Sequence, residues 1–411
     1  MMTKAANIGR IQENLEKIRD MTAPCAGGTT RYSYSPSYRE AADYLIRLMK
    51  DAGLETHEDS VGNIFGIRRG KNPSSPKLLS GSHLDTVGCG GYFDGQAGII
   101  CALEAARLMN ENNVSLESDY EVVATIMEEG SRFKNLGGSK FIMGVNTESD
   151  LDQLDQYGIS LRQAIKEYGL DPDLSAVCRR QENVKAFLEI HIEQNSRLEK
   201  AGLDMGIVDR IWGCRWYNVT VHGTSDHSST PMDERHDPMH ASSKFLSHMA
   251  DFITYNIEGK ASLTGGRISL IPNEINVIPS EARFTLDFRS GHMEVFEQIS
   301  AKLEDEIQKI QQEYGVQIDL ELYTETPPIQ NSSFVLQKLE ESLKEANLNY
   351  MHMDSRPGHD AMVFGMYWPT AMLFLPSHLG LTHCKEEWTD YEYVAKGAQI
   401  LFETLKKLDS E

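Results

Sequence analysis

The stretch KLLSGSHLDTVGCGGYFDGQAG, residues 77–98, is the most informative part of the sequence for the fold. It opens with an apolar run, and His83 and Asp85 follow where the predicted strand ends. Asp94 then lies in a glycine-rich loop that leads into an apolar stretch with helical periodicity. Ligands of α/β proteins bind at the carboxyl ends of the strands, and glycines let the backbone approach a bound group closely. The stretch therefore predicts a binding site around Asp94.

Strands and helices alternate on both sides of this stretch. Apolar runs bounded by turn residues predict strands, and apolar residues three or four apart predict the helices between them. The predicted strands are 63–67, 77–79, 122–127, 186–192 and 370–375. The predicted helices are 8–21, 38–52, 98–109, 159–168, 334–346 and 391–408. This alternation indicates an α/β domain with a mostly parallel sheet.

A different pattern begins near residue 212. Tyr217, Val219 and Val221 share one face of an alternating strand, which is typical of a sheet with one covered face. The predicted elements are a strand at 214–222, a helix at 238–257, strands at 267–271 and 281–289, a helix at 293–314 and a strand at 316–323. This βαββαβ order is that of a ferredoxin-like unit. We therefore predict an inserted domain at 212–326 within a larger domain formed by 1–211 and 327–411.

The composition argues against several classes of partner and location. The chain has 61 Asp and Glu residues against 40 Lys and Arg residues, a net charge of −21, so nucleic acid is not an expected partner. The sequence has neither an apolar run of signal-peptide length at its N-terminus nor a run long enough to span a membrane, so we expect a cytoplasmic protein without membrane contact. Its 6 cysteines form no CxxC pair, which leaves His and carboxylate side chains as the expected metal ligands.

A pair of acids follows the predicted strand in VVATIMEEGSRF, residues 122–133. Glu128 and Glu129 are adjacent, so their side chains must point in different directions. One of them could ligate a metal ion while the other serves as a general base for a water molecule, which is the pairing that hydrolysis requires. Taken alone, the pair fits a solvated surface charge equally well.

Two histidines complete the set of candidate ligands. His191 lies in the apolar strand FLEIHIEQ, and His383 follows the strand at 370–375 within LPSHLGLTHCKEEWT. Each alone also fits an ordinary core or loop histidine. Three imidazoles and two carboxylates near strand ends suit two zinc-like ions that share one carboxylate, and manganese or cobalt is also allowed. The candidate ligands are His83, Asp94, Glu129, His191 and His383.

Several longer motifs occur together along the chain. They are GSHLDTV with GGYFDG, EEGSRF, HIEQ, HSSTPM, NVIPSEARFTLDFR, GHDAM and PSHLGLTH. With these motifs in this order, the chain resembles the group of N-carbamoyl-L-amino acid amidohydrolases, allantoate amidohydrolases and β-ureidopropionases. That group belongs to the superfamily of di-metal aminoacylases and carboxypeptidases. The resemblance runs from about residue 7 to the C-terminus and implies a di-metal hydrolase domain with an inserted lid and dimerisation domain.

The resemblance implies a role for each candidate residue. Two divalent ions per subunit, zinc or else manganese or cobalt, would share Asp94 as a bridging ligand. Glu128 would be the general base, and Asp85 would be the acid that orients His83. The first ion would be held by His83, Asp94 and His191, and the second by Asp94, Glu129 and His383.

Residues around the substrate also follow from the resemblance. His227 would stabilise the tetrahedral intermediate and reach the site of the neighbouring subunit in a homodimer. Asn276 and Arg289 would bind the substrate carboxylate, a task that suits the planar fork of arginine. Whether they act on their own chain or on the neighbouring chain is left open. Further substrate contacts are expected at Gln194, His359 and Gly380.

This chain departs from the usual family pattern near several of these residues. The departures are Met127, Asn195, Ser228–Ser229, Arg356–Pro357 and Thr382. None of them removes a proposed ligand or the base, but two lie beside the proposed substrate or oxyanion groups. The substrate can therefore differ from the familiar ones of the family.

The sequence thus predicts a dimeric di-metal amidohydrolase. Its substrate would be a small anionic N-carbamoyl-L-amino acid or an allantoate-like ureido acid, cleaved with release of ammonia and carbon dioxide. An aminoacylase or dipeptidase that uses the same ions is the alternative within the enzyme class. A non-catalytic binding protein on this fold is the alternative from another class, and the presence of Glu128 together with all five ligand residues argues against it.

Overall fold

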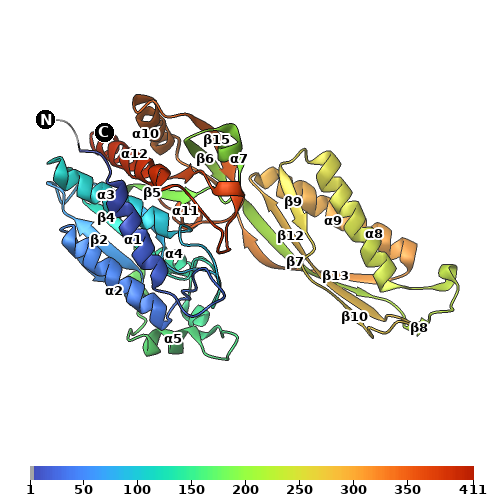
Figure 1. Cartoon of the computed structure of the whole chain (residues 1–411). Coiled ribbons are helices and arrows are strands. Elements are labelled where there is room, and N and C mark those ends of the chain that lie inside the picture. Colours follow the sequence, from blue (N-terminus) through green and yellow to red (C-terminus); the bar gives the residue numbers. More distant parts are fainter. Residues whose placement is uncertain (1–3) are drawn as a thin grey trace. The chain divides into compact units, whose positions relative to one another are not determined.

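The computed structural model describes residues 4–411, and the chain divides into two compact units (Figure 1). The first, which we call the large unit, contains the chain up to Asp209, Gln330–Met353 and His359–Glu411. The second, the inserted unit, contains Arg210–Ile329 and Asp354–Gly358. The insertion expected at 212–326 lies inside the second unit, whereas the return of the chain at Asp354–Gly358 was not expected.

A sheet of nine strands forms the centre of the large unit. Its four middle strands are parallel to one another. They are, in spatial order, β4 (Tyr120–Thr125), β3 (Lys77–His83), β5 (Val184–Ile192) and β16 (Thr370–Leu375). Every residue of β4 and β16 is buried, as expected for apolar strands covered on both faces. The predicted α/β class with a mostly parallel sheet is confirmed.

The remaining strands extend the sheet on its two sides. They are β1 (Glu55–Glu58), β2 (Ile64–Arg68), β6 (Met205–Ile211), β14 (Ile329–Gln330) and β15 (Tyr350–Ser355). The pairs β2–β4 and β6–β16 are antiparallel, so the parallel part of the sheet is confined to its centre. The sequence did not predict β1, β6, β14 or β15.

Helices surround this sheet, and some of them contact its strands directly. The long ones are α1 (Ile8–Asp20), α2 (Pro36–Asp51), α3 (Gln96–Glu111), α10 (Ser333–Glu345) and α12 (Tyr391–Asp409). The shorter ones are α4 (Gly137–Ile142), α5 (Leu161–Glu167), α6 (Leu174–Val177), α7 (Arg197–Ala201) and α11 (Asp360–Phe364). Helix α3 contacts β3, β4 and β5 as well as α1 and α12, and most of its side chains are buried. Because α3 begins just after Asp94, a well-packed helix fixes one end of the glycine-rich loop.

One strand end differs from its prediction in a way that matters for the site. The strand expected at 122–127 ends at Thr125. Met127 has a φ of 61° and Gly130 a φ of 71°, both in the left-handed region. A strand cannot continue through that conformation, which is uncommon for a residue other than glycine. The acid pair therefore lies on a tight turn rather than on the end of the strand.

The inserted unit has a second, antiparallel sheet with the order β10-β12-β7-β13, and β9 pairs with β12. In chain order the elements are β7 (Gly213–His222), α8 (Pro238–Asn256), β9 (Ala261–Thr264), β10 (Ile268–Ile271), β12 (Glu281–Ser290), α9 (Met293–Tyr314) and β13 (Gln317–Thr326). Tyr217, Val219 and Val221 are buried against this unit's own core, as their alternation predicts. A separate ribbon pairs β8 (Asp226–His227) with β11 (Val277–Ile278). Apart from β9, which the sequence did not predict, these strands and helices follow the βαββαβ order of a ferredoxin-like unit.

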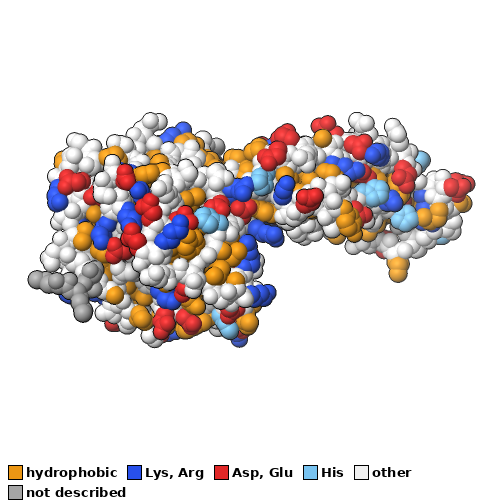
Figure 2. Space-filling view, turned by 90° about the horizontal axis from the view of Figure 1, so that it is seen from above, with side chains coloured by type: hydrophobic (Ala, Val, Ile, Leu, Met, Phe, Trp, Pro, Cys, Tyr) orange, Lys and Arg blue, Asp and Glu red, His pale blue; other side chains and the backbone are white. Residues whose placement is uncertain are grey.

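The surface carries charges of both signs. On the face drawn in Figure 2, Lys and Arg side chains are interspersed with Asp and Glu side chains. Within residues 4–411, no helix combines the length and the apolar character needed to cross a bilayer.

Candidate metal centre

The candidate ligands converge at one edge of the parallel sheet. His83 is the last residue of β3, and His191 is the last but one of β5. Asp94 lies in the loop before α3, Glu129 follows β4, and His383 follows β16. The carboxyl ends of neighbouring parallel strands meet at the same edge of a sheet, which is where open α/β sheets bind ligands. The structure therefore brings together all five residues that the sequence singled out as ligands.

Asp94 lies at the centre of this cluster. Its Oδ1 atom is 3.0 Å from His191 Nε2 and 3.5 Å from His83 Nε2. Its Oδ2 atom is 3.1 Å from His383 Nε2, which in turn is 3.3 Å from Glu129 Oε2. Each carboxylate oxygen of Asp94 thus faces a different set of partners, as a ligand shared by two ions must.

Backbone carbonyl groups fix the tautomers of two of the rings. His83 Nδ1 is 3.0 Å from the carbonyl oxygen of Asp85, and His191 Nδ1 is 2.9 Å from that of Ile192. A carbonyl oxygen only accepts hydrogen bonds, so each Nδ1 carries the proton. In the neutral rings, each Nε2 therefore directs a lone pair at the Asp94 carboxylate. The lone pairs and the carboxylate repel one another, and a cation between them would be ligated by both. Metal-bound histidines typically donate their other ring N–H to an acceptor such as these carbonyl oxygens.

The residues present fit two divalent ions. Ligand atoms about 2.1 Å from a tetrahedral ion lie about 3.4 Å apart. The contacts around Asp94 range from 3.0 Å to 3.5 Å. In addition, Asp94 Oδ1 and His191 Nε2 are buried without a hydrogen-bond partner. Two groups of residues have ligand atoms within 4.8 Å of one another. The first is His83, Asp94 and His191, and the second is Asp94, Glu129 and His383.

A third combination, Glu189, His191 and His359, meets the same distance criterion. Glu189 is already engaged, because its two oxygens accept hydrogen bonds from Ser82 Oγ at 2.6 Å and from the backbone N–H of Ala361 at 2.8 Å. This combination also competes for His191, whose Nε2 faces Asp94. The two groups that share Asp94 are therefore the better metal sites.

Electrostatics in the metal-free chain show how strongly this cluster attracts positive charge. Burial opposes ionisation of Asp94, but His191, His383 and His83 outweigh it and hold the pKa of Asp94 well below its usual range. Burial likewise disfavours a charged His83, yet Glu128, Asp94 and Glu129 raise its pKa well above the usual range. The contact with Asp94 raises the pKa of His383 to about 9. Protons thus balance the carboxylates here, and metal ions would replace those protons.

Glu128 is placed differently from its neighbour Glu129. Its carboxylate is buried, and Oε2 lies 3.7 Å from His83 Nε2, outside both groups of ligands. Burial raises the pKa of Glu128 well above its usual range, and the nearby Glu129 adds to the effect. An acid beside a metal site that does not itself ligate, and that holds a proton readily, has the properties of a general base.

Asp85 contacts both His83 and the acid pair. Its backbone carbonyl oxygen lies 3.0 Å from His83 Nδ1, so Asp85 stays the proposed residue that orients this ring. The carboxylate accepts hydrogen bonds from the backbone N–H groups of Glu128 at 3.1 Å and Glu129 at 3.3 Å. His83 and Asp85 are two residues apart at a strand end, so the ring reaches the carbonyl while the side chain turns toward the acid pair.

Of the three further substrate candidates of the large unit, two contact the proposed ligands and the third packs beside the segment that follows Gln194. Gln194 has a φ of 56°, and its side-chain amide donates to Asp94 Oδ2 at 2.8 Å. The buried ring of His359 lies 4.4 Å from the ring of His191. A Cβ atom on Gly380 would lie 2.6 Å from the backbone nitrogen of Ser196, so glycine is required there for close packing.

The candidates of the inserted unit form a separate set. His227 is exposed on β8, and its Nδ1 lies 2.7 Å from Ser229 Oγ. Exposed Asn276 precedes β11, and its carbonyl accepts from the backbone N–H of Ser228. Arg289 lies on β12, where its guanidinium pairs with Asp287 at 3.0 Å. His227 and Asn276 thus neighbour each other on one ribbon, while Arg289 is engaged on its own strand.

Two buried charged residues near the ligands were not predicted. Arg31 is fully buried, and it donates to the carbonyl oxygens of Leu84, Ile18 and Met21. Burial lowers its pKa to about 10. Glu387 is also buried, and burial together with Asp94 raises its pKa to about 7. The sequence offered only a weak signal for Glu387, namely an acid four residues after His383.

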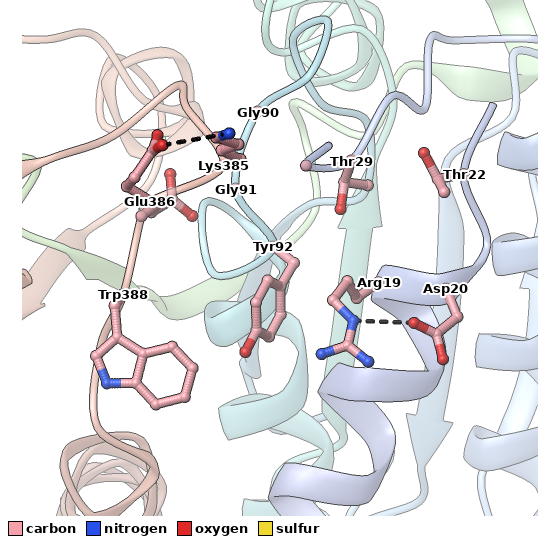
Figure 3. A pocket seen from close by; sticks show the side chains of 12 residues that line it. Arg19, Asp20, Thr22, Thr29, Gly90, Gly91, Tyr92, Lys385, Glu386 and Trp388 are labelled. Atoms are coloured by element: carbon pink, nitrogen blue, oxygen red, sulfur yellow. Dashed lines mark hydrogen bonds and ion pairs between the residues drawn. The ribbon is translucent and has the colours of Figure 1, made fainter. Parts of the chain in front are cut away.

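A cavity of about 580 Å³ is lined in part by Gly90 and Gly91 of the glycine-rich loop (Figure 3). Tyr92 and Trp388 flank it, and the ion pairs Arg19–Asp20 and Lys385–Glu386 lie along its wall. Glu387 contributes to the lining as well, although its carboxylate accepts a hydrogen bond from the backbone of the loop that carries Asp94.

A parallel sheet that presents three imidazoles, a shared carboxylate and a separate acid at its strand ends is typical of a metal-dependent hydrolase. The model of peptidase family M20/M25/M40 matches residues 79–407. The chain belongs to this family.

Similar proteins support this assignment along the whole chain. N-carbamoyl-L-amino-acid amidohydrolase of Paenarthrobacter aurescens is 34% identical over 100% of both chains. Allantoate amidohydrolase of Escherichia coli (strain K12) is 36% identical over 95% of both chains. Among solved structures, an amidase of the hydantoinase/carbamoylase family from Burkholderia multivorans superposes with a TM-score of 0.90 at 29% identity, covering 99% of both chains. These relatives act on carbon–nitrogen bonds, as the resemblance of the motifs implied.

Proposed function

We propose that this protein is an amidohydrolase that uses two divalent ions to remove the carbamoyl group of a small N-carbamoyl-L-amino acid or allantoate-like acid. The observation that carries the proposal is the position of Asp94, whose two oxygens face two separate groups of ligands. The names of the relatives supply the substrate class. Zinc suits the imidazole and carboxylate ligands, and manganese or cobalt is compatible with them.

Glu128 is the proposed general base. When bound, the two ions supply a Lewis acid for the substrate carbonyl and lower the pKa of the attacking water. Glu128 accepts the proton of that water and returns it to the leaving nitrogen, while Asp85 holds the backbone of the acid pair in place. The carbamoyl acid is thereby converted to the amino acid, ammonia and carbon dioxide.

The inserted unit would supply the groups that recognise the substrate. His227 accepts from Ser229 through Nδ1, so its Nε2–H is free to donate to the oxyanion. Arg289 and Asn276 bind the substrate carboxylate, for which Arg289 must exchange its contact with Asp287. Gln194, His359 and Gly380 line the substrate on the side of the large unit.

We also propose that the active form is a homodimer in which His227 serves the site of the neighbouring subunit. The exposure of His227 on a short ribbon supports this role, because an exposed side chain is available to a second chain. The inserted unit is then the lid and dimerisation domain.

An aminoacylase or dipeptidase is the second candidate, favoured by the family's description as peptidases. A panel of N-carbamoyl-L-amino acids, allantoate, N-acyl-L-amino acids and dipeptides distinguishes the two. The proposal predicts ammonia release from a ureido substrate and its loss after chelation. Release of a free amino acid from acyl or dipeptide substrates, without ammonia from any ureido acid, would establish the second candidate. Metal binding without turnover of the panel would indicate a binding protein.

A further inference from the structure

Glu387 lies where two ligand-bearing loops meet. It is only 2% exposed, and each of its carboxylate oxygens accepts two hydrogen bonds. A carboxylate offers about four acceptor positions, and these contacts account for all of them. The hydroxyl of Thr382 has a single hydrogen, which Glu387 Oε2 shares with Asp94 Oδ2. Two of the four donors belong to the loop that carries Asp94, and two to the segment that carries His383.

The first oxygen holds the Asp94 loop. Oε1 accepts from the backbone N–H groups of Phe93 at 3.0 Å and Asp94 at 3.1 Å. The side chain of Glu387 also occupies the space beside Gly91, where an added Cβ would lie 2.1 Å from its carboxyl carbon. The loop is therefore shaped around this one side chain.

The second oxygen holds the His383 segment. Oε2 accepts from the hydroxyl of Thr382 at 3.0 Å and from the backbone N–H of His383 at 3.3 Å. The φ of His383 is 56°, a left-handed conformation that costs free energy in residues other than glycine and persists only where its surroundings hold it. Glu387 provides one of those constraints at the proposed ligand itself.

Thr382 connects the same side chain to Asp94. Its hydroxyl lies 3.1 Å from Asp94 Oδ2 as well as 3.0 Å from Glu387 Oε2. Asp94 Oδ2 is the oxygen that faces His383, whereas Oδ1 faces His83 and His191. The two hydrogen bonds to Thr382 and His383 thus bear on the second group of ligands alone, whereas the two to the Asp94 loop bear on both groups.

We propose that Glu387 is a positioning residue that holds Asp94 and His383 in place for the ion bound by Asp94, Glu129 and His383. The proposal rests on the two-ion centre of the proposed function. Carboxylates that orient metal ligands typically contribute 10- to 100-fold to metal affinity. We expect metal affinity to fall by about this factor in Glu387→Gln. The amide nitrogen would replace one of the two carboxylate oxygens, and it would then face hydrogen-bond donors that it cannot accept from. The loss should fall mainly on the second ion.

The test is a competitive titration of the metal-free full-length chain with Zn²⁺ against a chelating dye, which gives a separate affinity for each ion. Glu387→Gln is compared with Thr382→Val, which removes the bridging hydroxyl, and with Thr382→Ser, which keeps it. Glu386→Gln is the matched control, because it changes the same charge on the neighbouring, exposed residue. The Co²⁺ absorption spectrum of each variant and the unfolding of each metal-free chain in denaturant are measured in parallel.

The proposal is supported if Glu387→Gln and Thr382→Val bind one ion more weakly, with an altered Co²⁺ spectrum and unchanged unfolding. Thr382→Ser and Glu386→Gln should then bind both ions with near-normal affinity. Wild-type affinities in Glu387→Gln overturn it. Equal weakening of both ions together with easier unfolding also overturns it, because Glu387 would then act only through general stability. If the wild-type chain binds a single ion, the two-ion centre is wrong, and the affinity of Glu387→Gln for that ion still decides whether Glu387 positions its ligands.

Discussion

The two units hold their candidate residues in contrasting ways. In the large unit, His83 and His191 are buried, their rings are fixed by carbonyl groups, and both point at Asp94. In the inserted unit, His227 is exposed on a two-residue strand, and Arg289 is paired with its own neighbour. The proposed ligands are thus organised before any substrate binds, whereas one proposed substrate-binding group, Arg289, must change partners. Metal binding and substrate recognition should therefore be separable by mutation.

The largest effect is expected in the large unit, from Asp94→Ala. Asp94 is the one ligand common to both groups, so its loss should remove both ions and abolish turnover. Each single histidine variant should lose one ion preferentially. Metal content after dialysis is the measurement. Retention of two ions per chain by Asp94→Ala contradicts the bridging role.

Glu128→Gln should separate chemistry from binding within the large unit. The amide fills the same space but cannot accept the proton of water, so turnover should fall by about 10²-fold or more while both ions stay bound. Glu129→Gln is the matched control, because it changes a proposed ligand and should release an ion. Normal turnover by Glu128→Gln would assign the base elsewhere.

His227→Ala tests the proposed role of the exposed histidine of the inserted unit. Loss of an oxyanion donor should lower turnover by about 10²-fold with metal content unchanged. If His227 serves the neighbouring subunit, inactive His227→Ala and Glu128→Gln chains should regain activity after mixing, because one site of each mixed dimer is then intact. Verified mixed dimers that remain inactive would show that His227 serves its own chain or has no catalytic role.

Acidification should empty the large unit of metal. Burial disfavours charged rings at His83 and His191, but the neighbouring carboxylates raise their pKa values, and the contact with Asp94 raises the pKa of His383 to about 9, so His383 retains its proton at neutral pH when no metal is bound. Ions must displace such protons, and affinity should fall about tenfold per pH unit for each proton displaced. Calorimetry in buffers of different ionisation enthalpy counts the protons released. Activity that persists in acid after chelation contradicts a metal mechanism.

The smallest effect is expected from Arg289→Lys. A point charge replaces a planar fork, so KM for the acidic substrate should rise about tenfold while metal content and unfolding stay unchanged. Unchanged saturation kinetics would place the carboxylate site away from Arg289.

The convergence of the proposed ligands was predictable from sequence because these residues lie near strand ends. His83, Glu129 and His383 each follow an apolar run, and parallel strands bring such positions to one edge of the sheet. Neighbouring acids and glycines then indicate the chemistry without any knowledge of long-range contacts.

Contacts between distant segments were not predictable in this way. Glu387 holds Asp94, which is 293 residues away in the sequence, through backbone groups that no motif reveals. The contact between His83 and the carbonyl of Asp85 depends on ring orientation rather than on residue type. Strands β6 and β15 were not predicted. The strand predicted at 122–127 was too long, because the residue type of Met127 does not reveal its left-handed conformation.

The central claim is that two ions assembled around Asp94 in the large unit drive hydrolysis of a ureido acid. It is tested most directly by adding Zn²⁺ stepwise to the metal-free chain while ammonia release from an N-carbamoyl-L-amino acid or allantoate is measured. We predict that activity rises to its maximum as occupancy reaches two ions per chain. Full activity without metal, or two bound ions without ammonia release from any ureido acid, would contradict the account.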